Sequence, residues 1–310
     1  MISGDQIYVI GSSNTDMVVK AARLPAAGET LLGGDFLMVP GGKGANQAVA
    51  AARLGGQVVF VGNVGNDVFG ERTIDGLHKE EINCDFVDRD QDLPSGVALI
   101  IVDERGENQI VVASGANNTL NTAQVDGALR GAPEGAIVLI QLEIPLPTVS
   151  HIVRQAAGRR LRVIVDPAPV PPDGVPPEII EGVYLITPNE TEAKGLTGIE
   201  VVNESSAREA AKALLAAGAQ NVVITMGSNG ALLANSAGYE FFEPSKGKAV
   251  DTTAAGDCFN GALAAVLSRD RSVRESIQFA SRAAAISVTR LGAQTSLPYA
   301  DEILDADGVP

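Results

Sequence analysis

Two carboxylates, two hydroxyls and a glycine turn lie close together near the C-terminus, in residues 251–257, DTTAAGD. Apolar residues recur at helical spacing over positions 259–267, so the segment is expected to open a helix. The first N–H groups of a helix have no partner inside it and, with the helix dipole, attract an anion. We therefore predict an anion-binding turn at Gly256. The alternative is that Asp257 only caps the N–H groups of its own helix.

A second glycine-rich segment, GGKGANQA, occupies residues 41–48. It is not a phosphate loop of the G-x-x-x-x-G-K-[ST] type, because Leu and Gly stand at positions 37 and 44. A Gly-Gly pair before a helix is often only a tight turn. Here Lys43 and Asn46 follow it, and Asn14 and Asp16 precede it. Short polar side chains supply the paired donors and acceptors that sugar hydroxyls need, so the set favours a polyol site.

The composition limits the class of partner. The 310 residues include 38 acidic and 23 basic side chains, a formal net charge of −15, which disfavours binding to nucleic acid or to an anionic membrane. No apolar stretch approaches the ~18 residues of a membrane span, and the N-terminus lacks the pattern of a signal peptide. Cys84 and Cys258 form neither a disulfide framework nor a zinc pattern. We expect a soluble cytoplasmic protein.

Short apolar runs alternate with helical patterns along most of the chain. The run at residues 7–10 is followed by GSSNTD and another strand pattern, so a dinucleotide-binding unit is excluded. The alternation predicts an α/β fold, a central, mostly parallel sheet with helices on both faces, in a single domain over residues 1–310. Further strands of this sheet are expected at 58–61, 136–141, 162–165, 183–186, 222–225, 231–234 and 239–243. Helices are expected at 45–54, 71–80, 123–129, 148–157, 190–196, 207–217 and 273–289, and after Gly256.

One hairpin interrupts this alternation. Residues 96–102 and 109–113 are rich in β-branched side chains and are joined by DERGEN, which favours a turn. We expect the hairpin to pair with residues 15–40, giving a small sheet outside the main one that acts as a lid. Because exposed sheet edges can pair with another copy of the chain, a homodimer through this lid is a further hypothesis.

Three aspartates, Asp88, Asp90 and Asp92, have the spacing that opens a calcium-binding loop. Such a loop needs Gly at its sixth position and Glu at its twelfth, where this chain has Leu93 and Leu99. We therefore predict a solvated turn here.

The chain resembles the ribokinase family of sugar kinases over nearly its whole length, through GGKGANQA at 41–48 and DTTAAGD at 251–257. The resemblance implies transfer of the γ-phosphoryl group of ATP to the primary hydroxyl of D-ribose, giving D-ribose 5-phosphate. It also implies that Asp257 is the base and that the amides of Ala255, Gly256 and Asp257 form an anion hole. Such an enzyme mainly aligns the reactants and neutralises developing charge.

The resemblance also assigns residues to the two substrates. On their own, NETE at 189–192 could be only an acidic helix start, and TMGSNG at 225–230 only a hairpin turn. In the family, the residues matching Asn14, Asp16, Gly42, Lys43, Asn46, Glu143 and Asp257 hold the sugar. Those matching Asn189, Thr225, Gly227, Ser228, Gly230, Gly256 and Ser281 lie by the nucleotide.

Two cations are implied in the same way. Mg²⁺ accompanies ATP and is organised through water by the residue matching Glu192. A helix ending at Gly292 could have an ordinary glycine cap, but its convergent carbonyls also suit a large monovalent ion. In the family, K⁺ lies beside the anion hole, held by groups matching Asp251, Thr253, Ser287, Arg290, Gly292 and Ser296.

Two alternatives stay open from the sequence. A kinase of the same fold for 2-deoxyribose, fructose or a nucleoside would carry the same signatures. A non-catalytic sugar-sensing protein would be expected to lose the base, and the presence of Asp257 weighs against it. Cys258 and Ser281 depart from the family pattern, in which Thr and His are commoner, and this affects only the expected nucleotide preference.

Overall fold

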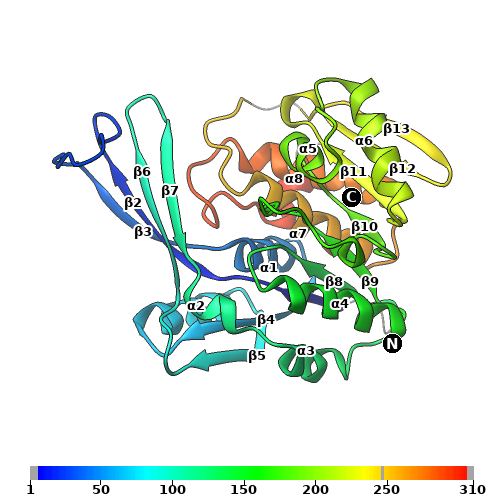
Figure 1. Cartoon of the computed structure of the whole chain (residues 1–310), viewed down its shortest axis with the longest axis horizontal. Helices are drawn as coiled ribbons and strands as arrows, with labels where there is room; N and C mark the ends of the chain where they lie inside the picture. The colour runs from blue at the N-terminus through cyan, green and yellow to red at the C-terminus, as the bar shows by residue number, and fades with distance from the viewer. Residues whose placement is uncertain (1–5, 246–247, 306–310) are drawn as a thin grey trace.

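Two sheets organise the chain in the computed structural model, which describes residues 6–245 and 248–305 (Figure 1). Among these residues, the strand orders are β13-β12-β11-β10-β9-β8-β1-β4-β5 in the large sheet and β3-β2-β6-β7 in the small one. The strands are β1 (Gln6–Ile10), β2 (Asn14–Lys20), β3 (Phe36–Gly41), β4 (Gln57–Gly65), β5 (Asn83–Asp90), β6 (Gly96–Val102), β7 (Asn108–Ala113), β8 (Ile137–Ile140), β9 (Arg162–Val165), β10 (Leu185–Ile186), β11 (Asn221–Thr225), β12 (Ala231–Asn235) and β13 (Gly238–Phe242). The helices are α1 (Lys43–Arg53), α2 (Val68–Lys79), α3 (Thr122–Leu129), α4 (Leu146–Gly158), α5 (Glu190–Thr197), α6 (Glu204–Ala216), α7 (Ala255–Leu267), α8 (Val273–Ser287) and α9 (Ala300–Asp305).

The large sheet is parallel from β11 to β5, and β12 and β13 add an antiparallel edge. Side chains along β1 alternate between two buried clusters, because Tyr8 and Ile10 face one and Ile7 and Val9 face the other. The first cluster includes residues of α3, α4 and α6, and the second includes residues of α1, α7 and α8. The predicted fold, a mostly parallel sheet with helices on both faces, is confirmed.

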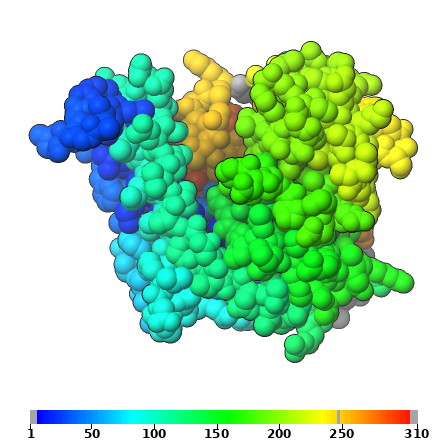
Figure 2. Space-filling view, in the orientation of Figure 1, coloured from blue at the N-terminus to red at the C-terminus, as the bar shows by residue number. Residues whose placement is uncertain are grey.

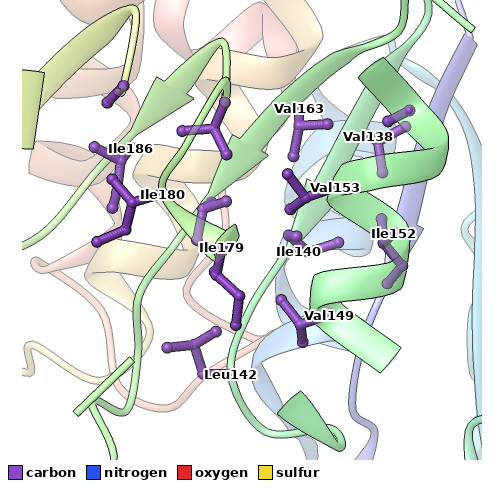
Figure 3. Packing of buried hydrophobic residues seen from close by; sticks show 14 of the residues in the cluster. Val138, Ile140, Leu142, Val149, Ile152, Val153, Val163, Ile179, Ile180 and Ile186 are labelled. Atoms are coloured by element: carbon purple, nitrogen blue, oxygen red, sulfur yellow. The ribbon is translucent and has the colours of Figure 1, made fainter. Parts of the chain in front are cut away.

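The packing of α4 on β8 shows how the sequence pattern produces these layers (Figure 3). Val149, Ile152 and Val153 recur at helical spacing on α4. They lie in the same buried cluster as Val138 and Ile140, which are alternate residues of β8. Each such side chain contributes about 1.5–3 kcal/mol when it is fully buried. The helical spacing in α4 and the alternation in β8 therefore place apolar side chains on the two faces that pack together.

The predicted small sheet is present and extends out from the main body (Figure 1). β6 and β7 form the expected hairpin, and β2 joins it in parallel with β6. β3 pairs antiparallel with β2 and begins at Phe36, so only part of the predicted segment 15–40 is in strands. Two glycines turn the chain before it, and Gly34 N–H donates to Lys20 O at 2.7 Å.

The prediction of a solvated turn at residues 88–92 is wrong for its first half. β5 continues to Asp90 and pairs with β4 as the edge strand of the large sheet. Its Phe86 packs against a buried cluster, but most of its other side chains are polar, as edge strands tolerate. The turn starts at Asp90, whose carboxylate accepts hydrogen bonds from the N–H groups of Asp92 and Leu93.

Several predicted elements differ in length: β4 extends over 57–65 rather than 58–61, and β10 covers only 185–186 of the predicted 183–186. The helix α9 near the end of the chain was not expected. Within the described residues, no helix combines the length and the apolar character that a membrane span requires.

Candidate active site

The N-termini of α1 and α7 carry the two signature segments. α1 starts after Gly42, which has φ 88°, and a Cβ at that position would lie 2.6 Å from Asn14 N. α7 starts after Ala254 in a left-handed conformation, and no side chain caps it. The carboxylate of Asp257 is buried and accepts hydrogen bonds from α1, at Oδ2 from Asn46 Nδ2 (2.9 Å) and at Oδ1 from Gln47 Nε2 (3.0 Å). The capping alternative for Asp257 is therefore wrong.

A cavity of about 190 Å³ opens in front of the start of α7. It lies where β9, β10 and β11 end, and ligands of open parallel sheets bind at such carboxyl ends. Figure 2 shows a hollow between the small sheet and the C-terminal half of the chain, with orange segments at its back. The cavity is lined by Lys43, Asp166, Ala168, Thr187, Asn189, Glu192, Thr225, Thr252, Ala254, Ala255, Gly256, Asp257, Phe259 and Asn260.

Glu143 meets the start of α1 although it follows β8 in the sequence. Its Oε2 accepts a hydrogen bond from Ser12 Oγ at 2.5 Å and one from Lys43 N at 3.2 Å. Burial alone would lower the pKa of Lys43, but surrounding carboxylates outweigh burial and raise that pKa, so the ammonium stays charged. The carboxylates that raise the pKa are those of Asp257, Asp166, Glu143 and Glu192.

Asp16 lies on β2 opposite the end of β3. A Cβ at Gly41 would come within 2.3 Å of the Asp16 carboxylate, so a larger residue there would displace that carboxylate. Burial, followed by the nearby charges of Glu143 and Asp257, raises the pKa of Asp16 to about 6. This carboxylate therefore changes charge close to neutral pH.

The amide of Asn14 is oriented by Asn117, a buried residue that the sequence did not single out. Asn117 Nδ2 donates to Asn14 Oδ1 (2.8 Å) and to Ser13 O (3.1 Å), and its Oδ1 accepts from Ser13 N (3.0 Å). Because Oδ1 of Asn14 already has a donor, the Nδ2 of Asn14 is left to donate to a ligand.

Gln47 and Asp166 are also site residues that were not predicted. Gln47 Nε2 donates to Asp166 Oδ2 at 2.7 Å as well as to Asp257. Burial raises the pKa of Asp166 well above its usual value, although Gln47 and the charge of Lys43 act in the opposite direction. One signal was available for Asp166, since it directly follows β9 at the edge where ligands bind.

Asn189 and Glu192 form a capping box at the start of α5, as their helix-start alternative predicts. Asn189 Oδ1 accepts from Glu192 N (2.9 Å), and Glu192 Oε2 accepts from Asn189 N (2.8 Å). Both residues nevertheless line the cavity, beside Thr225. Burial is the main cause that raises the pKa of Glu192.

The other residues assigned to the nucleotide lie apart from this cavity lining. Gly227 and Ser228 lie in a 3-10 turn that ends at Gly230. Gly230 has φ 91°, and a Cβ there would lie 2.1 Å from Phe242 O, so its conformation requires glycine. Ser281 lies half-buried within α8. The structure therefore groups Asn189, Thr225 and Gly256 in one cavity and leaves these four residues outside its lining.

The segments assigned to K⁺ meet beside α7. Asp251 Oδ1 accepts from Thr253 N (2.9 Å) and Thr253 Oγ1 (2.6 Å), and Asp251 Oδ2 accepts from Gly292 N (2.8 Å). Burial would raise the pKa of Asp251, but these hydrogen bonds outweigh it and lower that pKa. The buried hydroxyls of Ser287 and Ser296 are 2.9 Å apart.

These segments offer oxygen donors of the kind that a monovalent cation accepts. Arg290 directs its side chain to Glu302, so only its carbonyl could contribute. The remaining donors are carboxylate, hydroxyl and carbonyl oxygens, which suit a weakly hydrated cation. Over residues 6–245 and 248–305, no group of three or more His, Cys, Asp or Glu side chains is arranged to hold a metal ion.

Comparisons with known proteins assign this chain to a family. The model of the pfkB family carbohydrate kinases matches residues 5–300. The chain belongs to this family. The ribokinase of Bacillus subtilis is 40% identical to it over 297 residues, which cover 96% of this chain and 97% of that protein. The ribokinase of Haemophilus influenzae is 39% identical over 299 residues, with coverage of 96% and 97%.

A solved relative is similar over the same extent. The structure of Arabidopsis thaliana ribokinase complexed with ribose and ATP is 29% identical, has a TM-score of 0.89, and covers 97% of this chain and 98% of its own. As a member of the pfkB family, this chain is a phosphotransferase with an alcohol group as acceptor.

Proposed function

We propose that this chain is an ATP-dependent sugar kinase that phosphorylates the primary hydroxyl of D-ribose to give D-ribose 5-phosphate. The observation that carries the proposal is the start of α7, where uncapped amides and the carboxylate of Asp257 face one cavity. The similarity to ribokinases over nearly the whole chain supports ribose as the acceptor and ATP as the donor.

In the transfer, Asp257 accepts the proton of the sugar hydroxyl while the hydroxyl oxygen bonds to the γ-phosphorus. The bond from that phosphorus to the bridging oxygen breaks, and ADP leaves. The amides of Ala255, Gly256 and Asp257 stabilise the oxygens of the transferred group, and each such donor is worth ~3 kcal/mol by analogy with oxyanion holes. General-base assistance adds ~10²–10⁴-fold.

The sugar is held next to the start of α7. The Nδ2 of Asn14 is free to donate to one hydroxyl, and the carboxylates of Asp16 and Glu143 accept from others. Lys43 and Asn46 lie at the start of α1, and Gly42 lets that helix approach closely. These contacts position the primary hydroxyl toward Asp257, and such positioning can supply about 7–11 kcal/mol of the barrier.

ATP is proposed to lie across the carboxyl ends of β10 and β11. Asn189, Thr225 and Gly256 border its phosphates, and the turn at Gly227, Ser228 and Gly230, with Ser281, borders its nucleoside. Mg²⁺ is proposed to accompany ATP through water bound to Glu192. Carboxylate oxygens at the cavity wall fit this ion, which retains several of its waters in proteins.

K⁺ is proposed as an activator beside the anion hole, held by Asp251, Thr253, Ser287, Arg290, Gly292 and Ser296. When bound there, the ion would supply positive charge that stabilises the segment leading into α7. The oxygen donors described above fit it, and the contacts from Asp251 to Thr253 and Gly292 already join the two segments.

The remaining proposals concern the whole chain. It is proposed to fold as one domain over residues 1–310, with the segments 15–40 and 96–113 as a lid that excludes water from the transferred group. The ends of that range lie outside the described residues. We propose a homodimer through the lid, and a cytoplasmic location with neither nucleic acid nor membrane as partner. Cys84 and Cys258 are free thiols, which suits a reducing compartment.

A panel of acceptors tests the substrate. ADP release is measured with D-ribose, 2-deoxyribose, fructose and a nucleoside at equal concentrations with Mg²⁺ and K⁺. D-Ribose is expected to give the highest kcat/KM. A higher kcat/KM with another acceptor would replace ribose in the proposal, and ribose binding without turnover would identify a sugar-sensing protein.

A further inference from the structure

Gln47 is fully buried between two carboxylates and has no part in the mechanism above. Its Nε2 donates to Asp257 Oδ1 at 3.0 Å and to Asp166 Oδ2 at 2.7 Å, so each amide hydrogen has its own carboxylate. Its Oε1 accepts from Gln141 Nε2 at 2.6 Å. The reverse orientation of the amide would direct its oxygen at both carboxylates. These partners therefore determine which atom of the Gln47 amide is oxygen and which is nitrogen.

Asp257 is held at both of its oxygens by consecutive residues of α1. Gln47 donates to Oδ1 and Asn46 to Oδ2. Rotation of a carboxylate about its last bond has only a broad preference of its own. Two donors on different oxygens therefore decide which way Asp257 presents its remaining lone pairs.

The packing of α1 against α7 brings the amide within reach. Gly261 lies one turn after Asp257 on α7, and a Cβ there would be 2.6 Å from Gln47 O and 2.5 Å from the Cβ of Ala50. Glycine at 261 thus allows the backbones of α1 and α7 to approach each other at Gln47.

We propose that Gln47 is a positioning residue for phosphoryl transfer, which aims the Asp257 carboxylate at the sugar hydroxyl. This role rests on the proposed function, because it requires Asp257 to be the base. Asp166 and Gln141 hold Gln47 at its two ends, so the amide is itself rigid. Gln47 is placed to act through Asp257 rather than on either substrate.

The test is the kinetics of Gln47→Met, which keeps the length of the side chain and removes both donors. Because misplacing a reacting group by about 1 Å costs about 10²-fold, kcat is expected to fall by about 10- to 100-fold. The KM for ATP should change less than about threefold, because Gln47 makes none of the nucleotide contacts. An unchanged kcat would overturn the proposal.

Two further variants separate positioning from loss of folding. Thr148→Val removes a buried hydrogen bond to Leu120 O, remote from the site, and controls for the loss of stability. This variant should lose about as much Tm as Gln47→Met but keep its kcat unchanged. If Gln47→Met does not fold, Gln47→Asn serves instead, because it stays polar, adds no charge beside Asp166 and Asp257, and withdraws the NH₂ group by one methylene. It must show the same loss in kcat.

A double-mutant cycle distinguishes this role from the proposed function. Asp257→Ala removes the group that Gln47 orients. Adding Gln47→Met to this variant should therefore lower the residual turnover by less than about twofold. Such non-additivity is expected of residues that act as a unit. A further loss as large as in the wild-type background would overturn the positioning role. Normal turnover in Asp257→Ala alone would instead refute Asp257 as the base.

Discussion

At the residue scale, the contacts of Asp257 predict what its amide analogue would do. Asp257→Asn keeps the shape but removes the base, and its NH₂ would face the NH₂ of either Asn46 or Gln47. We expect kcat to fall by about 10²-fold or more, the lower range for loss of a general base. Ribose affinity, measured by calorimetry, should change far less. Turnover close to that of the wild type would remove Asp257 from the mechanism.

Asp16 is expected to give a pH dependence to the proposed ribose binding. The carboxylate is buried near Glu143 and Asp257, and its pKa is raised to about 6. Below that pH it becomes protonated and loses acceptor capacity, so ribose should bind more weakly as the pH falls from 7 to 5. Asp16→Ala should weaken binding at every pH. Calorimetry on Asp16→Asn is the control, because its ribose affinity should depend much less on pH. If Asp16→Ala and Asp16→Asn both bound ribose as tightly as the wild type, the sugar site would lie elsewhere.

Only part of this site could be predicted from the sequence. Asn46 and Asp257 stand within recognisable segments, whereas Asp166 reaches Gln47 across 119 positions of the chain. Asn117 likewise meets Asn14 across 103 positions. Such contacts depend on which strands become neighbours, and no local spacing encodes that order.

At the element scale, composition was informative where a strand is buried on both faces and misleading at the edge of the sheet. The continuous apolar run of β1 follows from burial on both sides, with successive residues in different clusters. β5 lies at the edge of the sheet, and its polar residues at 83, 85, 88, 89 and 90 hide its strand character. The tertiary pairing with β4 overrides that composition.

The start of α7 is the element whose geometry a cation would control. Asp251 joins the segment before α7 to Gly292 after α8. We expect activity in K⁺ to exceed that in Na⁺ at equal ionic strength, because the larger, more weakly hydrated ion fits the oxygen donors better. Initial rates are compared with ATP and Mg²⁺ saturating. Asp251→Ala should abolish the difference, and equal rates for the wild type in the two salts would contradict the cation site.

At the scale of the whole molecule, the small sheet leaves apolar side chains uncovered on both of its faces. All six residues of β7 are exposed, and they follow the free edge of the sheet. The exposed large apolar side chains of this sheet are Phe36, Leu37, Met38, Leu99, Ile110, Val111 and Val112. A monomer would keep this surface in water, whereas a second copy packed on it would cover it.

We therefore expect light scattering to give twice the chain mass of 31.9 kDa. Val111→Lys combined with Val112→Lys places a charge on each face of β7, because neighbouring residues of a strand point to opposite faces, and should give the monomer mass. Val202→Lys is the matched control, since Val202 is 68% exposed and Val111 67%, but Val202 lies outside the sheet. A monomeric wild type, or a doubly substituted chain that still dimerises, would exclude the small sheet as the interface. Loss of the dimer in the control would show instead that any exposed lysine disrupts association.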